Sequence, residues 1–108
     1  MRKFNTEYPL LKEMYANDYY PDFLVDKIRD EIRKVIAFLE TGVTDTEQIQ
    51  EKFDSMTIAF NELEEEFEEH DSELESIARD TIAADVIKIL NDFDIPLDAE
   101  TALREREW

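Results

Sequence analysis

The sequence contains no cysteine, one glycine, three prolines and one histidine among its 108 residues. Without cysteine, the chain cannot form a disulfide, use a thiolate nucleophile or build a cysteine-based zinc site. A single glycine also leaves no glycine-rich loop that could cradle a phosphate. No apolar run approaches the roughly 20 residues that a membrane-spanning helix needs. These absences exclude several common kinds of catalytic and binding site.

Basic residues are also scarce, with 12 Lys and Arg against 29 Asp and Glu, which gives a formal net charge of −17. Such a chain is not held on nucleic acid or on anionic lipid by its overall charge. The start, Met1–Glu7, is basic but lacks the apolar core of a signal peptide. We therefore expect a cytoplasmic protein whose natural counterpart is a basic protein surface or a cation.

Apolar residues recur every three or four positions through most of the chain, which predicts helices. Pro9 begins a short helix, and Pro21 begins a second helix that continues to Gly42. No segment alternates between apolar and polar residues for long enough to predict a strand. The sequence therefore indicates an all-α fold class.

Capping-box spacings indicate where two further helices begin. Thr44 and Glu47 predict the start of a third helix, and Asp71-Ser72 with Glu75 predict a fourth over roughly residues 72–93. The core side of the third helix is predicted to hold Ile49, Phe53, Met56, Phe60, Leu63 and Phe67. The fourth helix has the broadest apolar arc in the chain, so we expect it to be the most buried element.

A last short helix is predicted after a break at Asp94-Ile95-Pro96, with Asp98 as its cap. The expected fold is thus a single-domain, all-helical bundle over residues 1–108, with three long and two short helices. The length and the 43% hydrophobic content suffice for one well-filled core. The sequence leaves open whether the protein is a monomer or a homodimer.

Negative charge is concentrated in one stretch, because thirteen acidic residues and one base, Lys52, lie between Asp45 and Glu75. Like-charged pairs four residues apart cost about 0.2–0.5 kcal/mol each in an isolated helix, and no neighbouring lysine relieves them. A solvated face kept acidic for solubility is one explanation, and a docking surface for a basic partner is the other. The candidate contact residues on this face are Glu62, Glu65, Glu66 and Glu69.

All four tyrosines lie in the first 20 residues, and Tyr19 and Tyr20 directly precede Pro21. Both rings cannot easily face inward there, although we expect at least one to pack over the end of the bundle. An exposed tyrosine is a rigid, amphipathic anchor of the kind that interfaces favour, so both are added to the candidate contact surface. The Tyr-Tyr-Pro run in an acidic helical protein also resembles the colicin-nuclease immunity proteins.

Arg79 falls within the apolar arc of the fourth predicted helix, which predicts a buried guanidinium. A buried charge needs a partner, and Glu75 lies one turn earlier in the favourable acid-before-base order. We expect a structural ion pair between the two. An anion-binding pocket around Arg79 is the alternative.

His70, at the end of the third predicted helix, could chelate a metal with Glu66 and Asp71. A half-buried histidine at a helix end is far commoner, so we expect neither a metal nor a cofactor. No serine or carboxylate pair stands in a recognisable catalytic arrangement, and we do not expect an enzyme.

Seven segments spread over almost the whole chain match a common pattern: Tyr8–Tyr15, Asp18–Asp22, Leu24–Lys27, Glu66–Glu69, Asp71–Glu73, Ala78–Arg79 and Arg106–Trp108. In these segments the chain resembles a family of small bacterial proteins catalogued as a domain of unknown function. The resemblance implies a single cytoplasmic domain and assigns it no activity.

We therefore expect a non-enzymatic interaction protein that binds and neutralises or regulates a basic protein, as an immunity protein or an antitoxin does. The alternative is a metal- or small-ligand-binding bundle that uses His70 with Glu66 and Asp71, or Arg79 for an anion. A third hypothesis is a homo-oligomer whose acidic face stays in solvent.

Overall fold

The computed structural model describes residues 3–108, so the first two residues of the basic start lie outside it. Within this range the chain contains no strand, and the predicted all-α class with three long and two short helices is confirmed. The helices are α1 (Lys12–Tyr15), α2 (Asp22–Leu39), α3 (Thr46–Glu69), α4 (Ser76–Asp92) and α5 (Ala99–Ala102). No helix in the described part of the chain is both long and apolar enough to cross a membrane.

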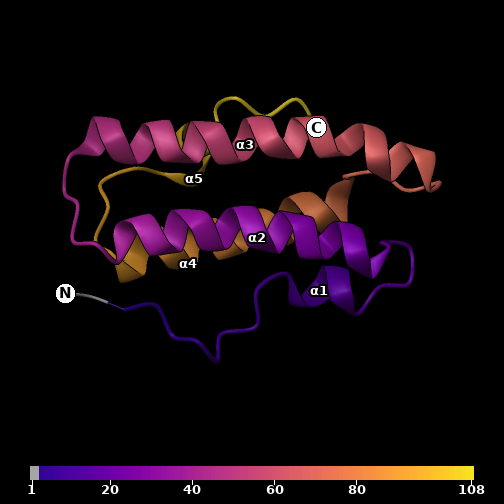
Figure 1. Ribbon diagram of the computed structural model, residues 1–108, viewed down its shortest axis with the longest axis horizontal. Coiled ribbons are helices and arrows are strands. Elements are labelled where there is room, and N and C mark those ends of the chain that lie inside the picture. Colours follow the sequence, from indigo (N-terminus) through magenta and orange to yellow (C-terminus); the bar gives the residue numbers. More distant parts are fainter. Residues whose placement is uncertain (1–2) are drawn as a thin grey trace.

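The long helices α2 and α3 pack against each other in antiparallel directions, and α4 lies behind α2 (Figure 1). Helix α1 packs against α2 and α4, whereas α5 packs against α3 and α4. The end of α3 and the beginnings of α2 and α4 therefore gather at one end of the bundle, at the right in Figure 1.

Helix α2 follows the predicted apolar stripe. Pro21 occupies its N-cap with an extended backbone, where its missing N–H leaves no bond unmade. Gly42 has a φ of 90°, which glycine adopts without steric cost, and the chain turns there toward α3. The buried side chains of α2 are Leu24, Val25, Ile28, Ile32, Val35, Ile36 and Leu39.

Helix α3 points its phenylalanines inward, as predicted. Its buried apolar side chains are Ile49, Phe53, Met56, Phe60 and Phe67, whereas Leu63 is only partly buried. The predicted cap at Thr44 is wrong by one residue. The Asp45 carboxylate accepts the backbone N–H of Glu47 at 2.9 Å and that of Gln48 at 3.3 Å. A carboxylate at this position also meets the positive end of the helix dipole, which favours Asp45 over the threonine hydroxyl.

The predicted capping box at Asp71-Ser72 is also wrong, because these residues end α3. The Ser72 N–H donates to the Phe67 carbonyl at 2.8 Å, and the Asp71 N–H donates to the Glu68 carbonyl at 3.1 Å. Asp71 has a φ of 57°. This is the Schellman arrangement, in which aspartate tolerates the left-handed position usually held by glycine. Helix α4 therefore begins only at Ser76.

The helix predicted from Pro9 is a single turn, and an irregular segment precedes it. Leu11 is fully buried with a left-handed φ of 58°, and its N–H donates to the Asp85 carboxylate of α4 at 2.7 Å. Nearer the N-terminus, the Phe4 N–H donates to the Glu40 carboxylate at 2.8 Å. These two bonds attach residues 4–11 to α4 and to the end of α2.

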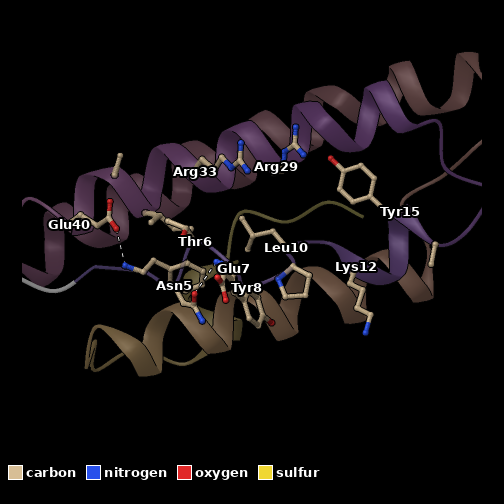
Figure 2. Close-up of a pocket in the computed structure, with 15 residues that line it drawn as sticks. Asn5, Thr6, Glu7, Tyr8, Leu10, Lys12, Tyr15, Arg29, Arg33 and Glu40 are labelled. Atoms are coloured by element: carbon tan, nitrogen blue, oxygen red, sulfur yellow. Dashed lines mark hydrogen bonds between the residues drawn. The ribbon is translucent and has the colours of Figure 1, made fainter.

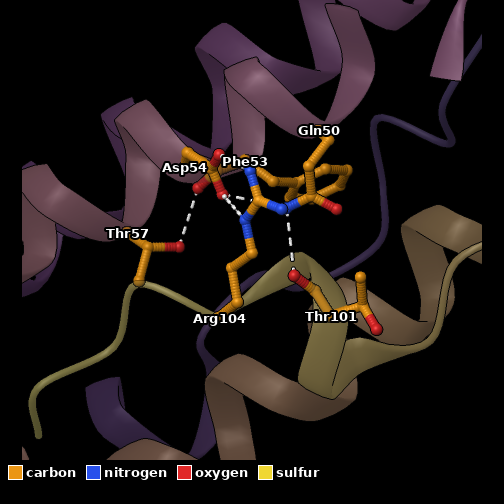
Figure 3. Close-up of polar contacts among 6 residues, drawn as sticks. All are labelled: Gln50, Phe53, Asp54, Thr57, Thr101 and Arg104. Atoms are coloured by element: carbon orange, nitrogen blue, oxygen red, sulfur yellow. Dashed lines mark hydrogen bonds and ion pairs between the residues drawn. The ribbon is translucent and has the colours of Figure 1, made fainter. Parts of the chain in front are cut away.

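The C-terminal segment is attached to α3 by polar contacts (Figure 3). Asp98 caps α5 as predicted, accepting the Thr101 N–H at 2.7 Å. The Gln50 amide donates to the Thr101 carbonyl at 3.0 Å. The Arg104 guanidinium binds both oxygens of the Asp54 carboxylate, at 2.6 and 3.1 Å. This two-point pairing fixes the orientation of the chain after α5.

Candidate functional site

Acidic residues are concentrated along the last two turns of α3 and in the segment that joins it to α4, at the end of the bundle where α2 also begins. We call this surface the acidic end, and it consists of Tyr19, Phe23, Glu62, Glu65, Glu66, Glu68, Glu69, His70, Glu73 and Glu75. Of the four predicted contact glutamates, Glu62, Glu65 and Glu69 are exposed. Glu66 is partly buried and binds Lys27 of α2 at 2.7 Å. The expectation that no lysine offsets the repulsion among these glutamates is therefore wrong at Glu66, because Lys27, on a helix distant in sequence, pairs with it.

The two adjacent tyrosines have opposite environments. Tyr20 is 2% exposed, packs edge-on against Phe67 at 6.4 Å and donates its hydroxyl to Glu75 at 3.4 Å. The expectation that Tyr20 belongs to the contact surface is therefore wrong, because the ring closes the end of the core. Tyr19 is 41% exposed and remains a candidate contact residue.

Phe23 is an exposed aromatic residue that the sequence analysis missed. It is 49% exposed, and its ring stands edge-on to the His70 ring with centroids 5.1 Å apart. The signal was present, because Phe23 lies in the first turn of α2 beside the apolar stripe rather than on it. With Tyr19, it places two accessible aromatic rings at the acidic end.

Carboxylates near the end of α3 contribute to raised pKa values on neighbouring groups. The pKa of Glu64 is raised, first by burial and then by the neighbouring carboxylates of Glu68 and Glu73, against the lowering effect of Arg79. The pKa of the Tyr19 phenol is raised by partial removal from solvent and then by Glu73 and Glu75. Groups on separate segments therefore respond to the same excess of carboxylates.

Arg79 does not occupy the predicted buried position. Both Arg79 and Glu75 are exposed, and no ion pair joins them within residues 3–108. The reason is that α4 begins at Ser76, so Glu75 is the N-cap with an extended backbone, and its carboxylate accepts from Tyr20 instead. At the first turn of α4, the edge of the apolar arc reaches solvent.

His70 does not assemble the metal site considered for it. Its Nδ1 donates to the backbone carbonyl of Glu66 at 2.9 Å, while the Glu66 carboxylate is bound to Lys27. Among residues 3–108, no group of three histidine or carboxylate side chains could hold a metal ion. The metal hypothesis for His70, Glu66 and Asp71 therefore gains no support from the geometry.

Comparison with known proteins gives a family but no function. The sequence pattern of a family of unknown function matches residues 4–108 of this chain. The chain belongs to DUF5713. This confirms the expected membership of a family of unknown function over almost the whole chain. No curated protein and no solved structure matches it.

A buried carboxylate in this DUF5713 chain was missed by the sequence analysis. Asp85 is 4% exposed and accepts the Tyr8 hydroxyl at 3.0 Å on one oxygen and the Leu11 N–H at 2.7 Å on the other. Burial raises the pKa of Asp85, although the two hydrogen bonds act in the opposite direction. Asp85 lies on the apolar arc with Ile82 and Ile89, so its position in the pattern was the available signal.

Proposed function

We propose that this protein is a non-enzymatic, acidic interaction protein that binds a basic protein partner through the acidic end. Binding neutralises or regulates that partner in the manner of an immunity protein or antitoxin. The observation that carries the proposal is the pair of exposed rings, Tyr19 and Phe23, set among carboxylates that have few cations of their own.

The two rings supply what carboxylates alone lack. An acidic surface steers a basic partner and sets the dependence on salt, but exposed charges contribute little affinity because water screens them. Aromatic side chains contribute large apolar areas with few rotatable bonds, which is why they dominate the energetics of interfaces. In this proposal the two rings therefore supply affinity, and the carboxylates steer the partner.

The local cations are too few to neutralise the surface. Lys27 is bound to Glu66, and Arg79 lies close enough to Glu64 to lower its pKa. The other glutamates on the outer face of α3, Glu62, Glu65 and Glu69, have no ion-pair partner within residues 3–108. A lysine- or arginine-rich surface would provide the missing partners.

Affinity for a basic probe tests the contribution of the carboxylates. The probe is a fluorescent peptide that carries arginine, lysine and leucine, and its control has glutamine at the basic positions. The double variant Glu65→Gln/Glu69→Gln should bind more weakly by about fivefold per charge, because two unit charges about 4 Å apart in water interact by about 1 kcal/mol. Glu47→Gln/Glu51→Gln makes the same charge change in the first turns of α3 and should bind as the wild type does.

The aromatic contribution is tested with a matched pair of truncations. Phe23→Ala removes a side chain that is 49% exposed, and Ile87→Ala removes one that is 48% exposed on α4, away from the acidic end. We expect the first to weaken peptide binding and the second to leave it unchanged. Equal affinity for both variants, or an affinity unaffected by raising the salt to about 0.5 M, would contradict the proposal.

A further inference from the structure

A concave region lies on another surface of the protein, between α2 and the N-terminal segment (Figure 2). It has a volume of about 870 Å³, within the roughly 300–1,000 Å³ typical of small-molecule sites. We call it the arginine groove, because Arg29 and Arg33 lie one helical turn apart along its α2 wall. The opposite wall includes Tyr8, Pro9 and Leu10.

The groove differs in charge from the rest of the molecule. Its lining contains three basic side chains, Lys12, Arg29 and Arg33, and two acidic ones, Glu7 and Glu40, in a chain whose net charge is −17. At one end of the groove, the Glu40 carboxylate already accepts a hydrogen bond from the Phe4 N–H. In Figure 2 the Lys12 ammonium points away from the two guanidinium groups, so Lys12 is not assigned a contact.

Neither arginine is fully satisfied by the protein. Arg33 is exposed and makes no ion pair or hydrogen bond from its side chain within residues 3–108. Arg29 is held between Asp26, at 3.4 Å, and the face of the Tyr15 ring, at 5.6 Å. Its Nε is nevertheless buried and has no hydrogen-bond partner. A buried donor on a charged group without an acceptor is costly, and such groups mark places where a ligand or water completes the bonding.

From these contacts we infer that the arginine groove binds a small organic anion, in which a carboxylate or phosphate group is joined to an apolar body. The planar guanidinium matches the geometry of both oxyanions, and Arg29 and Arg33 both line the groove from the same helix. The apolar body lies against Leu10, Pro9 and the α2 side chains Ile36 and Ala37. This site is separate from the acidic end and does not depend on the proposed partner.

Nuclear magnetic resonance titrations with four small probes test the inference. Phenyl phosphate and phenylacetate carry an oxyanion on an aromatic ring, benzyl alcohol lacks the charge, and inorganic phosphate lacks the ring. Either aromatic anion should bind saturably and shift the resonances of the groove residues, and the tighter of the two identifies the oxyanion. Benzyl alcohol and inorganic phosphate should bind more weakly than both.

The contribution of the free guanidinium is tested with Arg33→Gln. Because Arg33 is exposed and unpaired, the variant should fold normally, and affinity for the tighter aromatic anion should fall about tenfold or more. Lys34→Gln makes the same charge change at the next residue, outside the groove, and should bind as the wild type does. Arg33→Lys keeps the charge without the planar fork and should be intermediate.

Three results would overturn the inference. These are equal affinities for the wild type and Arg33→Gln, resonance shifts confined to surfaces outside the groove, and inorganic phosphate binding as tightly as the aromatic anions. The last result would show that the apolar wall is not part of the site.

Discussion

The acidic end and the arginine groove are opposite in charge, although one chain forms both. The acidic end combines two exposed rings with exposed carboxylates, most of which have no ion-pair partner within residues 3–108. In the arginine groove, two incompletely paired guanidinium groups line a concave, partly apolar wall. The net charge of −17 agrees with the many carboxylates of the acidic end, but it gives no indication that a groove lined by arginines is also present. Local pairing therefore decides what each surface can bind.

The difference arises from how helices α2 and α3 distribute their charges. Helix α2 mixes acids with bases, so the Lys34–Glu31 and Arg29–Asp26 pairs form along it. Helix α3 has Lys52 as its only base among the described residues. The Glu66 carboxylate of α3 is paired instead with Lys27, which lies on α2.

The largest expected effect is on the free energy of unfolding, and it distinguishes a core residue beneath the acidic end from a residue on its surface. Phe67→Ala removes a fully buried ring and should lower the free energy of unfolding by about 3–5 kcal/mol. Phe23→Ala should change it by less than about 0.5 kcal/mol, because the ring is half exposed. Urea unfolding followed by circular dichroism measures both. Similar losses in the two variants would mean that the rings of the acidic end are structural.

The next effect concerns the attachment of the groove's N-terminal wall. Asp85→Ala leaves the buried Leu11 N–H without an acceptor, which should cost about 1–3 kcal/mol. The groove should lose affinity for the aromatic anions, while the acidic end keeps its affinity for the basic peptide. Asp85→Asn should cost less, because an amide oxygen can accept from Leu11 while the amide group donates to the Tyr8 hydroxyl. Parallel loss of both binding activities in Asp85→Ala would show that the two regions are not independent.

The pH dependence of stability gives a smaller and more selective effect. The pKa of Asp85 is raised by burial above its ordinary value of 3.8, so the folded protein binds its proton more readily than the unfolded chain does. The contribution of Asp85 to stability is therefore present at low pH and is lost as the pH rises through the folded-state pKa. Subtracting the stability of Asp85→Asn from that of the wild type cancels the other carboxylates. The free energy of unfolding of the wild type should therefore rise relative to that of Asp85→Asn as the pH falls from about 7 toward about 4. A flat difference would mean that the carboxylate is not desolvated in solution.

A small effect on stability is also expected for Lys27→Gln, which removes the cross-helix partner of Glu66. The side chains of Lys27 and Glu66 are 47% and 40% exposed, so solvent screens the pair and the free energy of unfolding should change by less than about 1 kcal/mol. The same change makes the acidic end more negative and should strengthen binding of the basic peptide. Peptide anisotropy titrations of the wild type and the variant measure this, and weaker binding in Lys27→Gln would contradict the steering role of the surface.

The sequence predicted the helices because their apolar spacing is a local pattern that packing then preserves. Phe53, Phe60 and Phe67 lie four or three residues from other apolar side chains, and all three are buried. The errors occurred at helix ends, where short polar residues can serve either neighbouring element. Asp71 and Ser72 resemble the start of α4 in sequence, but they close the end of α3.

The candidate site was predictable only in part, because exposure depends on tertiary contacts. Nothing local distinguishes Tyr19 from Tyr20, and their different fates follow from the Phe67 ring on another helix. The arginine groove could not be foreseen, since its second wall is an irregular segment attached by Asp85 from far along the chain. Arg79 was misplaced for a similar reason: its burial was inferred from its position in the apolar arc, but it lies in the first turn of α4, where its side chain is exposed.

A resonance-by-resonance titration of the isotopically labelled protein with the basic peptide tests the central claim most directly. We predict saturable shifts that cluster at Tyr19, Phe23 and the last turn of α3, and that disappear as the salt concentration rises. Shifts that centre on the first turns of α3 around Glu47 and Glu51, or that spread evenly over every exposed carboxylate, would contradict the assignment of the acidic end as a binding surface.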